Sequence, residues 1–321
     1  MPPYKLKNWI KLENLDWDLL SMNANAIDLL YDNQHKINWN LLASNINALE
    51  LIENNKNTIL KENIDIWTLL SGNTSFSAMK LLEKYPEKIN WNELSSNPSA
   101  IHILEKNLDK INWMVFSKNP NAIHLLEQNK DKIDWNWLSE NPNAIHILER
   151  NIQKIDWYGI LKNQNALHLI KNIIHGFNPY LTLDDSWNPK YVSNYLSQNT
   201  SAINILEKQY SLIDWKELSK NVNAKNLLEK NLDKLDWKEL SGNPCAIELL
   251  QHNQNKIHWA YISLNENIFE IDYYLIKKKI EPFVEELMMV CFHPSRLKYY
   301  IEKHNYDIGD DTYINNDFGL P

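Results

Sequence analysis

Residues 119–135 read NPNAIHLLEQNKDKIDW, and residues 141–157 read NPNAIHILERNIQKIDW, the same pattern 22 positions further along the chain. An eleventh copy, SNYLSQNTSAINILEK, aligns when Ser193 stands in place of the tryptophan that ends the pattern. A fixed period of this length indicates a repeat architecture, in which each unit is stable only when it is stacked on its neighbours. The recurring tryptophans are Trp17, Trp39, Trp67, Trp91, Trp113, Trp135, Trp157, Trp215, Trp237 and Trp259.

Two positions keep their chemistry in every unit. The third residue after the tryptophan is apolar, and the sixth is asparagine. An asparagine caps the free N–H groups at a helix start, and the proline that follows it in several copies suits the first helical position. Because only asparagine and glutamine combine an acceptor with two donors, we expect each cap also to donate to a carbonyl group of the adjacent unit, forming a ladder. These structural asparagines are Asn23, Asn45, Asn73, Asn97, Asn119, Asn141, Asn163, Asn199, Asn221, Asn243 and Asn265.

Each unit is predicted to be a pair of short helices. After Asn141 the apolar residues fall at helical spacing, which predicts a first helix over about residues 142–150. An asparagine about ten residues after the cap, such as Asn151, is expected to end that helix in the left-handed conformation. The second helix is expected to start at the Asp or Asn before the tryptophan, which is again a good capping residue.

The pattern predicts an all-α fold, an α-solenoid of about eleven short helix-pair repeats with capping helices at both ends. We expect an N-terminal cap over residues 1–14, the solenoid over 15–268 with an insertion at 170–197, capping helices over 269–304 and an acidic flexible tail over 305–321. The stretch EELMMV at 285–290 is expected to bury one face of a capping helix. Leucine-rich repeats share this period range, but they need a strand written L-x-L, which the helical apolar face disfavours.

The bulk composition narrows the function. Apolar residues make up 44% of the chain, enough for a core, and the net charge of −8 argues against the basic surface that nucleic-acid binding requires. No apolar run is long enough to cross a membrane and the N-terminus lacks a signal-peptide pattern, so we expect a cytoplasmic protein. No phosphate-binding loop, metal-ligand spacing or nucleophile motif appears, which predicts a protein without enzymatic activity, metal or cofactor.

The repeat N-P-N-A-I-x-L-L-E-x-N-x-x-K-I-D/N-W resembles the short tandem repeats of a protein family that mimivirus-like giant DNA viruses of amoebae encode in many copies. The C-terminal stretch FVEELMMVCFHPSRLKYYIEKHNYD is similar to the closing segment of the same family. The two matches together cover most of the chain. The resemblance implies a viral protein made in the host cytoplasm, and it carries no catalytic residues over because the family has no assigned activity. Residues 67–91 and 170–197 depart from the regular repeat.

Four histidines, His102, His124, His146 and His168, occupy the same place in successive units. Packed helices lie about 8–10 Å apart, whereas zinc needs nitrogens at ~2.0–2.1 Å from one ion, so a shared metal site does not fit a regular stack. We interpret these residues as an exposed stripe, with pH-sensitive binding as the functional alternative. The glutamate and lysine columns of the repeats are expected to form surface ion pairs between units.

The two positions after the tryptophan vary most between copies. Met114, Val115, Trp137 and Tyr158 are apolar there, whereas other copies are often charged. These side chains are either additionally buried or part of an exposed patch that binds a partner, because aromatic residues and methionine are typical of interface centres. They are the first candidates for a binding site.

The insertion at 170–197 lacks the repeat spacing and carries Tyr180 and Trp187. It is expected to be either a binding loop or a structural bridge where the array changes direction. The whole sequence predicts a non-enzymatic scaffold or adaptor that binds a host or viral protein through an extended solenoid surface. The alternatives are a self-assembling component of a virion or viral factory and a binding module like the leucine-rich-repeat proteins.

Overall fold

The computed structural model describes residues 2–61, 64–174, 188–291 and 293–304, and it divides into two compact units. One unit, Tyr4–Glu270, holds all the repeats, and the other contains residues 1–3 and the chain from Ile271 onward. The predicted all-α repeat solenoid is confirmed, since successive short helices pack on their neighbours along the chain. Within the described ranges the strands are β1 (Tyr4–Leu6) and β2 (Phe269–Ile271), so no repeat contains the strand that a leucine-rich repeat needs.

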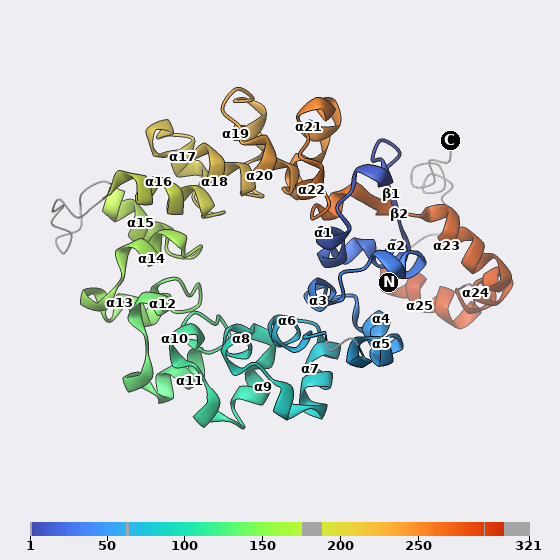
Figure 1. Ribbon diagram of the computed structural model, residues 1–321, viewed down its shortest axis with the longest axis horizontal. Coiled ribbons are helices and arrows are strands. Elements are labelled where there is room, and N and C mark those ends of the chain that lie inside the picture. The colour runs from blue at the N-terminus through green and yellow to red at the C-terminus, as the bar shows by residue number, and fades with distance from the viewer. Residues whose placement is uncertain (1, 62–63, 175–187, 292, 305–321) are drawn as a thin grey trace. The chain divides into compact units, whose positions relative to one another are not determined.

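The helix that contains the tryptophan position of each repeat belongs to an inner layer of the ring unit Tyr4–Glu270 (Figure 1). It starts at the tryptophan in every repeat except that of α16, where it starts four residues before Ser193. Its start is set by the preceding residue; the carboxylate of Asp134, for example, accepts from the N–H groups of Asn136 and Trp137. The inner helices are α1 (Trp17–Met22), α3 (Trp39–Leu42), α6 (Trp67–Gly72), α8 (Trp91–Ser96), α10 (Trp113–Phe116), α12 (Trp135–Ser139), α14 (Trp157–Lys162), α16 (Pro189–Gln198), α18 (Trp215–Lys220), α20 (Trp237–Ser241) and α22 (Trp259–Ile262).

In every repeat but the last, the helix after the constant asparagine lies in an outer layer, and a single 3-10 turn usually leads back to the next inner helix (Figure 1). The outer helices are α2 (Ile27–Asp32), α4 (Leu49–Asn54), α7 (Phe76–Lys84), α9 (Ile101–Leu104), α11 (Ile123–Gln128), α13 (Ile145–Glu149), α15 (Leu167–Ile174), α17 (Ile203–Leu206), α19 (Lys225–Glu229) and α21 (Ile247–His252). In the repeat of α4 the extra helix α5 (Lys56–Lys61) stands where other repeats have that turn.

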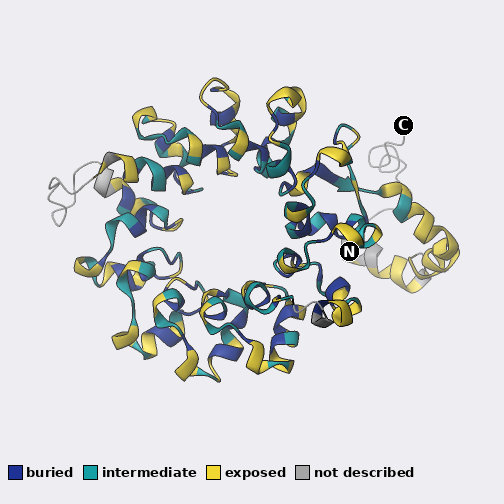
Figure 2. Ribbon diagram, viewed as in Figure 1, coloured by how far each residue is buried: buried dark blue, intermediate teal, exposed yellow. Residues whose placement is uncertain are grey.

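Apolar side chains from both layers form one continuous core. The apolar residue three positions after each tryptophan is fully buried, from Leu20 in the first repeat to Ile262 in the last. The alanine three positions after the constant asparagine is also buried, as Ala144 shows, which lets the inner and outer helices lie close together. Figure 2 shows the buried residues where the two layers face each other and the exposed residues at the outer tips.

The constant asparagines, which we call the asparagine column, join each repeat to the one before it. The Nδ2 of Asn141 donates to the carbonyl oxygens of Ser117 at 3.0 Å and Asn119 at 2.8 Å, while its Oδ1 accepts from the N–H of Asn143. All eleven members repeat this double donation, and each is nearly or fully buried. Each side chain therefore satisfies three backbone groups that would otherwise be buried without a partner.

A serine four positions after the tryptophan makes a second connection between repeats that the sequence analysis missed. The hydroxyl of Ser139 donates to the carbonyl of Trp135 and accepts from the N–H of Asp156 in the next repeat. Two repeats carry Ala43 and Leu161 at this position. The repeats that follow them are the two irregular ones, in which Trp67 comes 28 residues after the previous tryptophan and the insertion at 170–197 interrupts the spacing.

The array of repeats in the unit Tyr4–Glu270 is closed, because the first repeat is stacked on the last. The Nδ2 of Asn23 donates to the carbonyl oxygens of Ser263 at 2.9 Å and Asn265 at 3.2 Å, the bonds that every other member makes to its preceding repeat. The N–H of Asp16 also donates to the hydroxyl of Ser263, and β1 pairs with β2. The unit Tyr4–Glu270 is therefore a closed ring of eleven repeats (Figure 1), whereas the sequence suggested an extended surface.

Two local expectations are wrong. The residues after Asn141 form turns before the α-helix begins at Ile145, because the proline and the cap fix a tight first turn. Asn151 does not take the left-handed conformation; its φ is −136°, and its Nδ2 instead donates to the carbonyl of Ile147, four residues earlier. The side chain itself thus satisfies a free carbonyl at the helix end, so no positive φ is needed.

The second unit contains α23 (Tyr273–Ile280), α24 (Val284–Cys291) and α25 (Pro294–His304). The expectation that the stretch EELMMV buries one face is wrong, since Leu287, Met288, Met289 and Val290 are all exposed. None of the described helices, in either unit, has the length and apolar run needed to cross a membrane.

Candidate functional site

The apolar residues at the variable positions lie on three consecutive inner helices. Met114 and Val115 are on α10, Trp137 is on α12 and Tyr158 is on α14, each one or two residues after the start of its helix. Met114 is 47% exposed, and the other three are half-buried. The structure therefore places these four side chains on neighbouring inner helices and leaves part of each accessible, and it brings Val115 and Trp137 together at one cavity.

A cavity of about 440 Å³ opens between α8, α10 and α12. Val115 and Trp137 form its apolar wall, and Lys118 stands at its edge, while Met114 is not among the lining residues. The remaining lining residues are Asn92, Glu93, Ser96, Asn119 and Pro120, so a few polar groups stand beside a mainly apolar lining. A cavity of this size, with an aromatic wall and a few polar groups, has the dimensions of a site for a small ligand or for one side chain of a partner.

Charged side chains at the fifth position after the tryptophan connect three inner helices beside this cavity. Glu140 lies between two lysines, with its Oε2 2.6 Å from Lys118 Nζ and its Oε1 2.8 Å from Lys162 Nζ. Burial of the Glu140 carboxyl raises its pKa, but the two lysines outweigh this effect and hold the pKa below its ordinary value. The group is therefore an ionised carboxylate shared by two cations, and Lys118 Nζ also lies 5.3 Å from the ring centre of Trp137.

Tyrosines continue the same surface toward α16. Tyr158 packs edge-on against Tyr191 and Tyr195, with ring centres 6.0 and 6.1 Å away, and the latter two rings are stacked on each other. The hydroxyl of Tyr158 accepts from the N–H of Asn188, where the described chain resumes after residue 174. Lys162 Nζ lies 4.3 Å from the ring centre of Tyr195, which links the tyrosines to the charged group. We call Val115, Lys118, Trp137, Glu140, Tyr158, Lys162, Tyr191 and Tyr195 the inner patch.

The histidine stripe is on a different surface. His102, His124, His146 and His168 lie on outer helices and are exposed, each within 3.3 Å of a glutamate of the preceding repeat, as in the 2.6 Å contact of His124 with Glu105. In the part of the chain that the structure describes, no three His, Cys, Asp or Glu side chains are placed to hold a metal ion. The stripe therefore consists of separate surface pairs, each worth ~0–1 kcal/mol at most.

Among the described residues no lysine of the column forms an ion pair with a glutamate, so that expectation is wrong. Lys132 Nζ lies 4.6 Å from the ring centre of Trp113, and Lys154 Nζ lies 4.5 Å from that of Trp135. The same contact recurs in other regular repeats, where the lysine follows the tryptophan that begins its own repeat. This arrangement covers the exposed indole face with a cation and leaves the glutamate free for the histidine.

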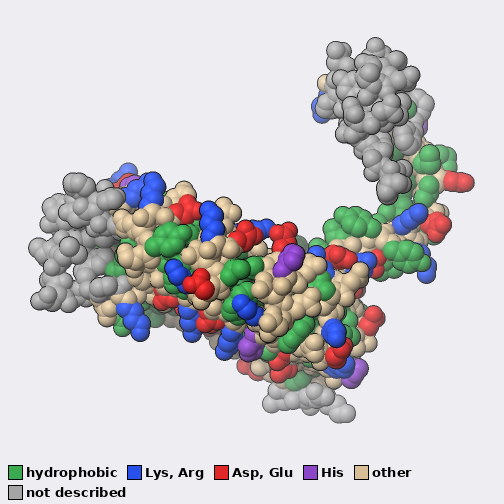
Figure 3. Space-filling model, turned by 90° about the horizontal axis from the view of Figure 1, so that it is seen from above, with side chains coloured by type: hydrophobic (Ala, Val, Ile, Leu, Met, Phe, Trp, Pro, Cys, Tyr) green, Lys and Arg blue, Asp and Glu red, His purple; other side chains and the backbone are tan. Residues whose placement is uncertain are grey.

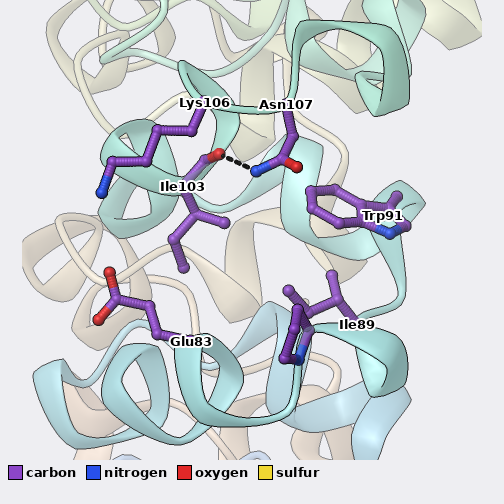
Figure 4. Close-up of a pocket in the computed structure, with 7 residues that line it drawn as sticks. Glu83, Ile89, Trp91, Ile103, Lys106 and Asn107 are labelled. Atoms are coloured by element: carbon purple, nitrogen blue, oxygen red, sulfur yellow. Dashed lines mark hydrogen bonds between the residues drawn. The ribbon is translucent and has the colours of Figure 1, made fainter.

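The insertion residues Tyr180 and Trp187 lie outside the described residues. A further cavity, of about 260 Å³, lies at the outer side of the ring and is drawn in Figure 4. Glu83 and Lys106 stand on one side of it and Ile89 and Trp91 on the other, while Asn107 bonds the carbonyl of Ile103. Most of these residues occupy positions that recur from repeat to repeat, so we treat this cavity as a result of stacking and not as a specific site.

Charged side chains of both signs are present on the surface. Figure 3, a view turned by 90° from that of Figure 1, shows Lys and Arg side chains interspersed with Asp and Glu. The chain carries 33 Lys and Arg against 41 Asp and Glu, whereas binding to nucleic acid needs clustered cations. The comparisons with known proteins add no further constraint, as no family model, curated protein or solved structure matches this chain.

Proposed function

We propose that this protein is a non-enzymatic interaction scaffold that binds a protein partner through the inner patch. The observation that carries the proposal is the position of Val115, Trp137 and Tyr158. These apolar residues stand where other repeats are often charged, and they lie partly exposed on three consecutive inner helices, with Val115 and Trp137 lining one cavity. Aromatic side chains beside a partly buried ion pair are typical of the residues that dominate binding energy at interfaces.

The chemistry of the patch indicates the kind of segment it binds. Lys118 and Lys162 keep 49% and 32% of their side chains exposed, whereas Glu140 between them is only 13% exposed. An incoming carboxylate meets the two cations first, and the aromatic walls accept an apolar side chain. We propose a partner segment that combines acidic and apolar residues. The resemblance of the repeats to those of giant-virus proteins supports a host or viral partner in an infected cell.

The test compares two matched substitutions in capture from infected amoebae. Trp137→Ala removes the aromatic wall of the cavity, and Tyr261→Ala removes a half-buried aromatic residue at the same repeat position, far along the chain. We expect wild type and Tyr261→Ala to enrich the same partner and Trp137→Ala to lose it, while circular dichroism shows all three folded. Binding should then be reproduced with the purified partner. Equal enrichment by both variants would show that the inner patch is not the binding surface.

A second candidate function, self-assembly, is favoured by the helices α23–α25. Their exposed apolar side chains are Tyr273, Tyr274, Ile280, Phe283, Val284, Leu287, Met288, Met289, Val290, Leu297 and Tyr299. Lys277–Lys279 at the end of α23 and the acids Glu285 and Glu286 at the start of α24 would meet in a two-fold pairing of two copies. Light scattering of the full chain tests this proposal. We expect a dimer that Met289→Glu converts to a monomer and that Glu266→Gln, a change on the ring, leaves intact; a wild-type monomer would exclude the pairing.

A further inference from the structure

The second repeat differs from the others at the point where it meets the third. Ala43 has no hydroxyl to accept a bond from the next repeat, and Ile66, before α6, provides no side-chain cap. The extra residues form α5, which follows α4 and precedes the irregular start of the third repeat. The two repeats remain joined by Asn73, which donates to the carbonyls of Ala43 and Asn45. The second and third repeats are therefore joined by hydrogen bonds at the asparagine column, and a gap is left between them on the outer side.

A cavity of about 460 Å³ occupies this opening, between α4, α5 and α7. Its floor is formed by Ile52, Ile59 and Ile66, which are 3–5% exposed, and its walls by half-buried residues that include Trp67 and Leu81. Like the cavity beside the inner patch, this one has a mainly apolar lining, here from branched and aromatic side chains. Its volume falls in the range of about 300–1,000 Å³ that small-molecule sites occupy.

The rim of the cavity is cationic. Lys56, Lys84 and Lys88 line it together with Tyr85, and Lys56 Nζ donates to the Tyr85 hydroxyl at 3.2 Å. This bond, with the charges of Lys56 and Lys84, lowers the pKa of Tyr85. Glu53 and Glu87 also line the cavity, but neither lies within 4.0 Å of a lysine nitrogen among the described residues. Among the residues that the structure describes, none of the three lysines that line the cavity therefore has a carboxylate within ion-pair distance.

Lys88 also differs from the other members of its column. In regular repeats the corresponding lysine lies over the tryptophan that begins its own repeat, as Lys110 lies over Trp91 at 4.7 Å. At this junction the ring of Tyr85 takes that place and packs edge-on against Trp67, with ring centres 5.5 Å apart. The substitution leaves Lys88 at the rim of the cavity, available to a ligand.

We propose that this cavity binds a small amphiphilic anion, a fatty acid of medium chain length, with its hydrocarbon tail on the isoleucine floor and its carboxylate at the rim. Lys56 and Lys84 are placed to meet the carboxylate, and the Tyr85 hydroxyl lies beside Lys56 to donate to it. Apolar burial supplies the affinity, and the lysines select the anion over a neutral or cationic head group. This site shares no residue with the inner patch, so a test of one proposal does not decide the other.

Calorimetric titration of the full-length protein with three ten-carbon amphiphiles tests the proposal. We expect decanoate to bind with a stoichiometry of one, and decanol and decyltrimethylammonium to bind about tenfold more weakly or not at all, because neither head group is an anion that can pair with the lysines. Lys56→Gln and Lys84→Gln should each weaken decanoate binding about tenfold. The control Lys110→Gln, in the regular fourth repeat, should leave it unchanged.

Three results would overturn the proposal. If decanoate does not bind at about 1 mM, the cavity is not a fatty-acid site, because that concentration corresponds to a binding free energy of only ~4 kcal/mol. Equal affinity for the three amphiphiles would show that the lysines do not select the head group. Equal loss in Lys56→Gln and Lys110→Gln shows that the effect is one of overall charge and not of this cavity. Because all three lysines are exposed, the variants should fold like wild type, which circular dichroism verifies.

Discussion

The substitution Asn23→Ala tests whether the ring closes in solution. In an open array the first repeat has no preceding neighbour, so the Asn23 side chain would make only its capping bond to the N–H of Asn25. In the closed ring its Nδ2 also donates to the carbonyls of Ser263 and Asn265, both from the last repeat. The same substitution therefore has two different costs, depending on whether the ends meet.

The magnitude follows from the three hydrogen bonds. Each net bond contributes about 0.5–1.5 kcal/mol, and Asn23 is only 2% exposed, so the groups left behind gain little from water. The closed ring predicts a loss of about 3 kcal/mol in the free energy of unfolding, whereas an open array predicts about 1 kcal/mol. Asn141→Ala, in the middle of the array, is the matched control, because its side chain makes the same three bonds in either arrangement.

Urea unfolding followed by tryptophan fluorescence and by circular dichroism measures both variants. Agreement of the two probes shows whether a single transition describes the loss of structure, which repeat proteins do not always have. We expect Asn23→Ala and Asn141→Ala to lower the unfolding midpoint equally. If Asn23→Ala costs about 1 kcal/mol while Asn141→Ala costs about 3, the ends are not joined and the closure is refuted.

Three further predictions concern other contacts. Ser139→Ala leaves the N–H of Asp156 without its acceptor and should cost about 1–3 kcal/mol in urea unfolding; the exposed control Ser96→Ala should change stability by less than ~0.5 kcal/mol, and equal effects would contradict a role of the serine between repeats. Glu140 has a folded-state pKa below that of an ordinary glutamic acid, about 4.3, so its contribution is present above that pH and is lost as the pH falls through the folded pKa. The stability difference between wild type and Glu140→Gln should thus shrink between pH 7 and 3, and a pH-independent difference would argue against the lysine pairing. His146→Ala should change the unfolding midpoint by no more than ~0.5 kcal/mol, because its contact with Glu127 is exposed; a larger loss would assign the stripe a structural role.

Local structure was predictable because each recurring residue type satisfies a hydrogen-bonding or packing requirement within a single repeat. Asn141 had to accept at a helix start and donate elsewhere, and Asp134 had to cap the helix of Trp135; both requirements are visible in a single repeat. Closure was not predictable in this way, because it depends on small rotations between repeats that add up to a full turn. The residues that join the ends, such as Asn23 and Ser263, are the same as in every other repeat, so nothing in their identity marks them as a junction.

The candidate site was predictable in part for a similar reason. Val115, Trp137 and Tyr158 stood out because they replace charged residues of other copies. Lys118, Glu140 and Lys162 were missed, since single charged residues in a repeat are usually solvated. Their signal was present in the alternation of sign at one position across three successive repeats. The cavity beside Lys56 was hidden as well, although Ala43 marks the junction by breaking the serine series.

The closure of the ring also orders the events of folding. Contacts between neighbouring repeats span a few tens of residues along the chain, so each repeat can stack as soon as it and its predecessor have been synthesised. The bonds of Asn23 span 240 residues to Ser263, and loop closure over such a distance is slow. One face of the first repeat therefore stays exposed to solvent until the last repeat has folded. Joining the two ends is expected to be the final, rate-limiting step of folding.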